Sequence, residues 1–195
     1  MTNRALRGVI FDLDGTLVLS DLDFDKIRAE IGISERTPIL EYLEKQSPKM
    51  QAKGMRILEK YERRGAESAT LSDGASEILL FLRQHKLKSA IVTRNSLESV
   101  QIVMSNLGFT VDAVVTRSDA APKPSPEPLI LACKKMGLQT KDVVFVGDFV
   151  FDRDAGANAG IETYIISNKN APSHPDEVSS LHDIIALLQR RQEIP

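Results

Sequence analysis

A short apolar run near the start of the chain is followed directly by two acids, and this pattern is compatible with few folds. Val9, Ile10 and Phe11 are β-branched or aromatic, which favours a buried parallel strand. Asp12 and Asp14 follow at once, although a buried strand has no packing use for two carboxylates at its tip. In open α/β sheets that tip is where ligands bind. The pair therefore predicts chemistry, with one acid attacking or holding a metal and the other moving protons.

Apolar runs of strand length alternate with amphipathic stretches along most of the chain. The strand-like runs lie at residues 9–11, 89–93, 113–116, 143–147 and 163–166. The helical stretches lie at residues 75–84, 97–107, 126–136 and 155–159, and residues 177–192 are expected to form a closing helix. Gly108, Gly137 and Gly160 follow apolar-periodic stretches, as is typical of helix ends. The alternation predicts an α/β fold, with a Rossmann-like parallel sheet and helices on both faces.

One long segment interrupts this alternation. From Ser20 to Leu71 the sequence shows helical periodicity and polar breaks but no strand pattern. Pro38 and Pro48 stand where helices are expected to begin. About fifty residues is too long for a loop. We therefore expect a core of residues 1–18 and 72–195, and a small helical cap of residues 19–71 inserted after the first strand.

The composition excludes several classes of function. The chain has 195 residues and a net charge of −2, so charge gives no argument for binding nucleic acid or an anionic membrane. The single cysteine, Cys133, excludes an internal disulfide and suggests a reducing compartment. No stretch approaches the ~20 apolar residues of a membrane span, and residues 1–4 lack a signal-peptide pattern. We expect a cytoplasmic protein, either a monomer or a weak homo-oligomer.

Polar side chains follow the later strands as well. Because the carboxyl ends of parallel strands share one edge of a sheet, we expect these side chains to meet. An Asp-Leu-Asp-Gly turn, with Gly15 at positive φ, is the alternative explanation of the first segment alone, but three further segments support the chemical interpretation. The residues at the expected edge are Asp12 and Asp14, then Thr93, Arg94 and Asn95, then Lys123, and finally Gly147, Asp148 and Asp152.

These segments together resemble the haloacid dehalogenase (HAD) superfamily, subfamily I, in the branch of the phosphoglycolate phosphatases. The resemblance depends on Phe-Asp-Leu-Asp-Gly-Thr-Leu at residues 11–17 and Gly-Asp-x-x-x-Asp at residues 147–152, with Thr93 and Lys123 in order between them. The four motifs, together with a helical cap after the first strand, cover nearly the whole chain.

The resemblance implies a role for each acid of the first motif. Asp12 would attack the phosphorus of a monoester and form an aspartyl-phosphate, which splits one difficult displacement into two easier steps. Asp14 would protonate the leaving oxygen and then take a proton from the attacking water. Gly15 and Gly147 are expected to let the backbone approach the ligand closely.

The resemblance also implies how the phosphoryl group is held. Thr93 would donate a hydrogen bond to a non-bridging oxygen, and Lys123 would neutralise charge on that group and on Asp12. Arg94 and Asn95 are expected to bind substrate with them. Taken singly, each has an ordinary structural alternative: Lys123 could be a solvated loop lysine, and Arg94 and Asn95 could cap the following helix.

Mg²⁺ is the cofactor that the resemblance implies. Asp12, the backbone carbonyl of Asp14, and Asp148 match the protein ligands of the family, and oxygen donors suit this ion. Asp152 matches the position that supports the metal shell or orients the lysine. Asp154 either shares that role or is an acid favoured by the start of a helix.

The residue at position 14 distinguishes relatives that act on phosphate esters from relatives that dehalogenate. Relatives that dehalogenate lack an aspartate there, so its presence favours phosphate esters. We expect a Mg²⁺-dependent phosphatase acting on a small organic phosphomonoester resembling phosphoglycolate. The alternatives are a sugar phosphomutase of the β-phosphoglucomutase type, a haloacid dehalogenase, and a catalytically silent binding module. Basic residues of the cap that either grip a second anionic group or form solvated helix faces are Arg28, Lys49, Lys53, Arg63 and Arg64.

Overall fold

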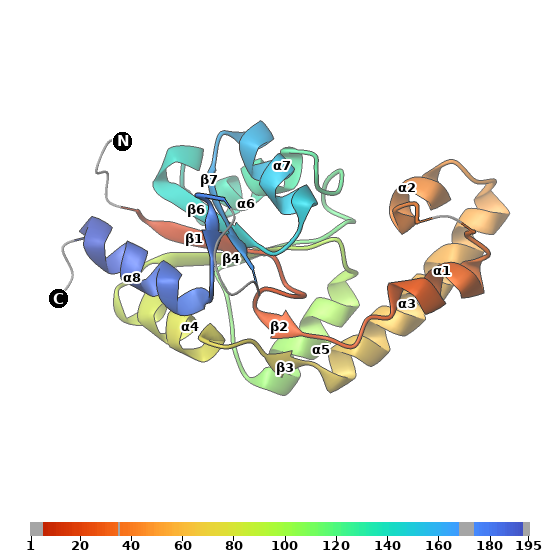
Figure 1. Cartoon of the computed structure of the whole chain (residues 1–195), viewed down its shortest axis with the longest axis horizontal. Helices are drawn as coiled ribbons and strands as arrows, with labels where there is room; N and C mark the ends of the chain where they lie inside the picture. Colours follow the sequence, from red (N-terminus) through yellow and green to blue (C-terminus); the bar gives the residue numbers. More distant parts are fainter. Residues whose placement is uncertain (1–5, 35, 168–173, 193–195) are drawn as a thin grey trace.

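The computed structural model describes residues 6–34, 36–167 and 174–192 (Figure 1). Its centre is a parallel sheet in the order β5-β4-β1-β6-β7-β8. The strands are β1 (Gly8–Phe11), β4 (Lys88–Val92), β5 (Ala113–Val115), β6 (Val143–Gly147), β7 (Glu162–Ile166) and β8 (Glu177–Val178). The two central strands, β1 and β6, are buried along their whole length, as their apolar sequences predict.

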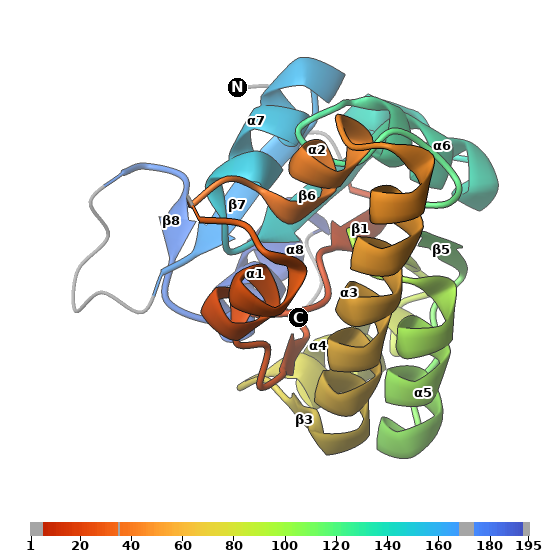
Figure 2. The same ribbon diagram turned by 90° about the vertical axis from the view of Figure 1, so that its right-hand side faces the viewer.

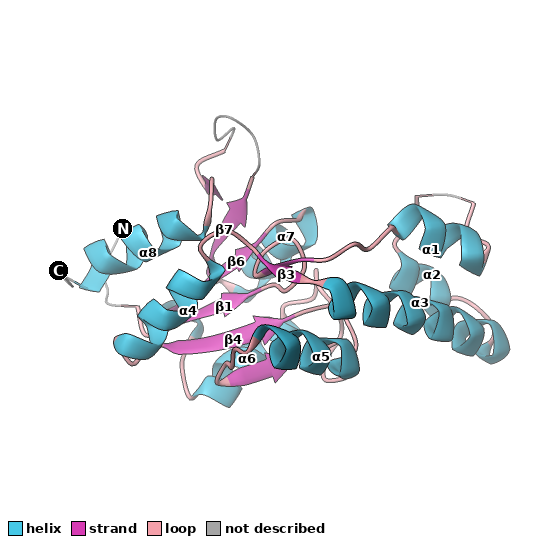
Figure 3. Ribbon diagram, turned by 90° about the horizontal axis from the view of Figure 1, so that it is seen from below, coloured by secondary structure: helices cyan, strands magenta, loops and turns pink. Residues whose placement is uncertain are grey.

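Helices cover both faces of the sheet, which Figures 1 and 3 show from two directions. The apolar faces of α4 (Ala75–Gln84), α5 (Leu97–Leu107) and α8 (Leu181–Gln192) pack in one core, together with Val9 and Phe11. On the opposite face, α6 (Glu127–Met136) and α7 (Val150–Ala159) pack against Ile10. This division follows from the alternation of side chains along a strand. The predicted α/β fold is confirmed.

Three parts of the prediction differ from the structure. The segment from residue 20 to residue 71, which we expected to lack strands, ends in the short strand Thr70–Leu71. The segment from residue 177 does not form one helix to residue 192, because Glu177–Val178 pairs with β7 before α8 begins at Leu181. The helix over residues 155–159 begins earlier, at Val150. A 3₁₀ turn, Thr140–Asp142, precedes β6. Cys133 is buried in α6, and burial raises the pKa of its thiol to about 11.

The segment after β1 forms a separate group of helices. β2 (Val18–Leu19) pairs antiparallel with β3 (Thr70–Leu71), and the chain between them forms α1 (Phe24–Ile31), α2 (Ile39–Glu44) and α3 (Pro48–Ser68). These helices share an apolar cluster of their own. Leu43 of α2 packs so closely on α3 that a Cβ on Gly54 would lie 2.2 Å from Cδ2 of Leu43.

The helical group extends beyond the carboxyl ends of the central strands. Figure 1 shows α1, α2 and α3 to one side of the sheet, joined to it by the β2–β3 ribbon. In Figure 2, α3 lies alongside α5, and the two helices are in contact. Across the described ranges, no helix combines the length and the apolar character that a membrane span requires.

Candidate active site

Three neighbouring strands bring the predicted residues to one place. β4, β1 and β6 are adjacent in the sheet, and Thr93, Asp12 and Asp148 each follow the last residue of one of them. A cavity of about 580 Å³ lies between this edge and the three helices of the insert. The sequence-predicted residues that line it are Asp12, Asp14, Thr93, Arg94, Asn95, Lys123, Asp148 and Asp152.

A buried lysine joins two of the acids. Lys123 is only 2% exposed, and its Nζ donates to Oδ1 of Asp12 at 2.7 Å and to Oδ1 of Asp152 at 2.5 Å. Burial by itself would lower the pKa of Lys123, but the charges of Asp12 and Asp152 outweigh it and raise that pKa. Lys123 therefore carries its charge inside the cavity wall, directly beside the Asp12 carboxylate.

Three carboxylates form an acidic cluster at the base of the cavity. Asp12, Asp148 and Asp152 each offer an oxygen, and these oxygens all lie within 4.8 Å of one another. Burial raises the pKa of Asp12 to about 8, with Lys123 opposing and the neighbouring acids adding to the rise. Burial and the charge of Asp152 raise the pKa of Asp148 to about 6. Crowded oxygen donors with this excess of negative charge suit a hard divalent cation such as Mg²⁺.

Asp152 also fixes the start of α7. Its Oδ2 accepts hydrogen bonds from the backbone N–H groups of Asp148, at 3.2 Å, and Phe149, at 3.0 Å. The same side chain therefore caps a helix, holds Lys123 and belongs to the acidic cluster. Asp154 is exposed and is not one of the three clustered acids.

The carboxylate of Asp14 has different partners. Nδ2 of Asn95 donates to its Oδ2 at 2.5 Å, and the hydroxyl of Ser20 donates to its Oδ1. Burial raises the pKa of Asp14, while these two hydrogen bonds oppose the rise. Asn95, which we expected to bind substrate, thus holds Asp14 in this structure. Sequence reasoning missed Ser20, which lies six residues after Asp14, as a partner of this carboxylate.

Arg94 is engaged by the helical insert. Its Nη2 contacts both carboxylate oxygens of Glu41 on α2, at 2.9 and 2.8 Å, and its Nη1 donates to the backbone carbonyl of Lys123. The guanidinium also lies 4.8 Å from the centre of the Phe151 ring. Thr93 is nearly buried, and its hydroxyl accepts from the backbone N–H of Asn95.

The two glycines that we expected at the ligand leave room for site carboxylates. A Cβ on Gly15 would lie 2.2 Å from Oδ2 of Asp148, and one on Gly147 would lie 2.4 Å from Cγ of Asp152. Gly15 also has a φ of +78°. At both positions a side chain would displace a neighbouring carboxylate, because acids fill the space beside the backbone.

The basic residues of the helical insert are only partly placed as the sequence suggested. Of the five basic candidates, Arg28 lines the cavity, and Arg36 lines it as well although sequence reasoning missed it. Arg63 instead forms ion pairs with Glu67 and Glu98. The other three candidates, Lys49, Lys53 and Arg64, are exposed on α3 and do not line the cavity.

The parallel sheet defines an α/β fold, and the acids and the lysine at its edge are typical of the active site of an enzyme. The model of the family described as haloacid dehalogenase-like hydrolase matches residues 19–166, and the chain belongs to this family.

Individual relatives agree with this assignment. A haloacid dehalogenase-like hydrolase domain-containing protein of Arabidopsis thaliana is 32% identical over 186 residues, covering 89% of this chain and 76% of the relative. An N-acetylmuramic acid 6-phosphate phosphatase of Pseudomonas putida is 29% identical over 195 residues, covering 88% and 86%. The crystal structure of a hydrolase from Pseudomonas syringae has the same fold, with a TM-score of 0.77, 20% identity and coverage of 94% and 98%.

Proposed function

We propose that this chain is a Mg²⁺-dependent phosphatase that hydrolyses small organic phosphomonoesters through an aspartyl-phosphate on Asp12. The observation that carries the proposal is the placement of Asp12 in the cavity wall, 2.7 Å from the buried Lys123 and one residue from Asp14. The Pseudomonas putida relative, named for a 6-phosphate ester, supports the same class of reaction.

Asp12 is the proposed nucleophile. Lys123 holds one carboxylate oxygen, Oδ1, and leaves Oδ2 free of that contact for attack on phosphorus. The ammonium also neutralises the phosphoryl oxygens as charge builds up on them, and Thr93 and the backbone of its loop fix their position. Phosphoryl transfer depends mainly on positioning and electrostatic stabilisation, so these groups supply most of the expected acceleration.

Asp14 is the proposed general acid and base. Burial raises the pKa of Asp14, which is the direction that a general acid needs in order to donate a proton to the leaving oxygen. Asn95 and Ser20 hold its two oxygens and thereby fix the direction of the transfer. The same carboxylate then takes a proton from the water that attacks the aspartyl-phosphate.

Asp12 and Asp148, with the backbone carbonyl of Asp14, are the proposed ligands of Mg²⁺. When bound, the ion supplies positive charge that stabilises the phosphoryl oxygens in the transition state. Asp152 lies in the same acidic cluster and ties it to Lys123, so it supports the ligands and orients the lysine.

Residues 19–71 are proposed to act as a cap that selects the substrate. Its helices provide the wall opposite the acids, with the cation of Arg28 and the apolar side chains of Phe24 and Ile39, and Arg36, which precedes α2, adds a second cation. A cavity of about 580 Å³ suits a small organic phosphate. 2-Phosphoglycolate is the first substrate to test.

The test is phosphate release from a panel of phosphomonoesters, measured with Mg²⁺ and with EDTA. The panel includes 2-phosphoglycolate, p-nitrophenyl phosphate and hexose 6-phosphates. We expect release that requires Mg²⁺, and the rank order identifies the substrate. Isomerisation of a hexose phosphate without release would establish a phosphomutase instead. Halide release from a haloacetate, or no turnover of any ester, would contradict the proposal.

A further inference from the structure

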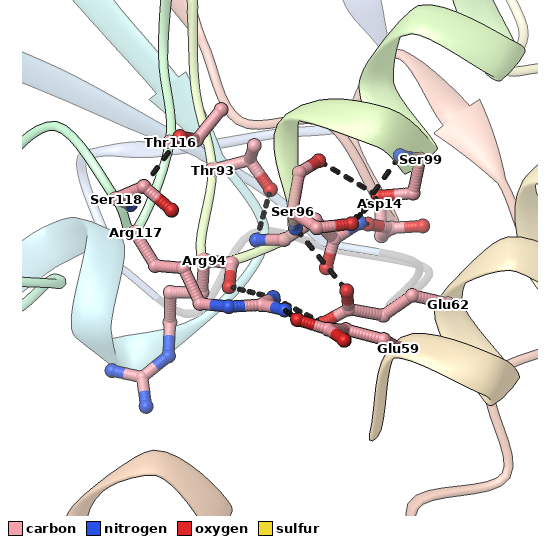
Figure 4. Close-up of polar contacts among 11 residues, drawn as sticks. Asp14, Glu59, Glu62, Thr93, Arg94, Ser96, Ser99, Thr116, Arg117 and Ser118 are labelled. Carbon is pink, nitrogen blue, oxygen red and sulfur yellow. Dashed lines mark hydrogen bonds and ion pairs between the residues drawn. The ribbon is translucent and has the colours of Figure 1, made fainter. Parts of the chain in front are cut away.

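A buried ion pair connects the helical insert to the core beside the cavity. Glu62 on α3 is 3% exposed, and its Oε1 lies 2.5 Å from Nη1 of Arg117, which follows β5 and whose side chain is 7% exposed. Figure 4 shows the two side chains meeting between α3 and the loops at the ends of the strands. Fifty-five positions separate them in the sequence.

The remaining polar groups of this pair hold the loop that follows β4. Nη1 of Arg117 donates to the backbone carbonyl of Arg94 at 3.1 Å, and the backbone N–H of Arg117 donates to the carbonyl of Asn95 at 3.5 Å. Oε2 of Glu62 accepts from the backbone N–H of Ser96 at 3.2 Å (Figure 4). The side chains of the pair therefore hold Arg94 and Ser96, and the backbone of Arg117 holds Asn95 between them.

This loop carries the groups that the reaction needs. Thr93 precedes the three fixed residues, and Asn95 is one of them and donates to Asp14. Ser96 caps α5, since its hydroxyl accepts from the N–H of Ser99. A shift of the loop backbone would therefore move the phosphate-binding hydroxyl and the partner of the proposed general acid at the same time.

A contribution to the stability of the fold does not by itself explain why this ion pair is buried here. Taking two charges out of water is costly, and apolar side chains of similar size are often as stabilising. Burial raises the pKa of Glu62, with Arg117 opposing the rise. Within the described residues, Nη2 of Arg117 is buried without a hydrogen-bond partner, and Glu59 lies 3.5 Å from it. Apart from their contact with each other, the hydrogen bonds that the two side chains make are those to the loop.

We propose that Glu62 and Arg117 are positioning residues that set the phosphate-binding loop from the side of the cap. The inference rests on the proposed function, since it concerns the geometry of that site. Because Glu62 belongs to α3, the contact at Ser96 is made only while α3 is seated against the core. The seating of the helical insert is thereby coupled to the placement of Thr93 and Asn95.

The test compares Glu62→Gln and Arg117→Met with the wild-type chain. Glu59→Gln is the matched control, because Glu59 lies about one helical turn away on α3 and faces Arg117 without contacting the loop. Circular dichroism establishes that each variant is folded at the assay temperature. Amide exchange over residues 93–97, the affinity for inorganic phosphate with Mg²⁺, and kcat/KM for p-nitrophenyl phosphate are then measured.

We expect faster exchange at Ser96 in both variants. Phosphate affinity and kcat/KM should fall about 10–100-fold, as expected when a loop is displaced by about 1 Å. The Glu59→Gln control should stay within about twofold of wild type, as expected for a half-exposed acid. Unchanged exchange at Ser96, or unchanged phosphate affinity in folded variants, would overturn the inference.

A double variant covers the case in which a single substitution prevents folding. Glu62→Met combined with Arg117→Met leaves no unpaired buried charge, so it should fold better than either single variant. If the pair were merely structural, this variant would recover phosphate affinity together with stability. Under our proposal its phosphate affinity stays low. Exchange and phosphate binding do not require turnover, so an inactive wild type that binds phosphate would contradict the proposed function alone.

Discussion

Substituting Gly15 by alanine isolates the contact between the first motif and the acidic cluster. A Cβ at this position would lie 2.2 Å from Oδ2 and 2.6 Å from Cγ of Asp148. Real Cβ atoms approach no closer than 3.0 Å, so the carboxylate must move by about 0.8 Å before the contact becomes tolerable. Because Asp148 is a proposed ligand of Mg²⁺, the displacement should weaken metal binding.

The same substitution at Gly160 supplies the matched control. Gly15 and Gly160 have φ values of +78° and +64°, so alanine is strained by about 1–2 kcal/mol at either position. For a chain of this size, that strain should lower the melting temperature by about 2–8 °C. Among the described residues, nothing lies within 4 Å of a Cβ at Gly160, at the end of α7. Only Gly15→Ala therefore combines strain with displacement of a ligand.

We expect Gly15→Ala to lower Mg²⁺ affinity by about 10–100-fold, which is the usual effect of disturbing the surroundings of a metal ligand. Gly160→Ala should leave this affinity at the wild-type value. The assay is the Mg²⁺ concentration that gives half-maximal phosphate release, supported by the rise of melting temperature with Mg²⁺, which needs no turnover. Equal Mg²⁺ affinity in the two variants would show that the position of the Asp148 carboxylate does not affect metal binding.

Two further substitutions test the lysine and the second acid. Lys123→Met removes the cation between Asp12 and Asp152, so the free energy of unfolding in EDTA should fall by about 3–5 kcal/mol. Urea denaturation measures this, with the exposed Lys141→Met as control, and equal stability of the two variants would contradict the buried pairing. Asp14→Asn should slow hydrolysis of alkyl phosphates by about 10²–10⁴-fold. It should slow p-nitrophenyl phosphate less, because nitrophenolate leaves without protonation, and equal losses would argue against an acid role.

The sheet was predictable because its central strands are buried on both faces. A continuous apolar run such as residues 143–147 leaves little choice but a central parallel strand. The β2–β3 ribbon and β8 escaped prediction, since each of these strands has only two residues and shows no alternation. Residues 177–178 follow a polar segment, and their pairing with β7 depends on the fold rather than on local pattern.

The residues of the candidate site could be predicted from the sequence for a similar reason. Parallel strands end at one edge, so Asp12, Thr93 and Asp148 had to lie near one another once the fold was inferred. The partners that the helical insert contributes could not be predicted. In the sequence Glu62 is an ordinary charged residue of a helix, and only the position of α3 beside the core shows its role. Arg117 had a signal that was overlooked, since it follows another strand tip at the same edge.

Acid quenching during turnover is the most direct test of an aspartyl-phosphate on Asp12. Wild-type protein is mixed with Mg²⁺ and p-nitrophenyl phosphate, quenched within the first turnovers, and digested for mass spectrometry. We expect one added phosphoryl group on the peptide that contains Asp12, and none in Asp12→Asn. Phosphate release without any adduct on that peptide, or release at the wild-type rate by Asp12→Asn, would contradict the account.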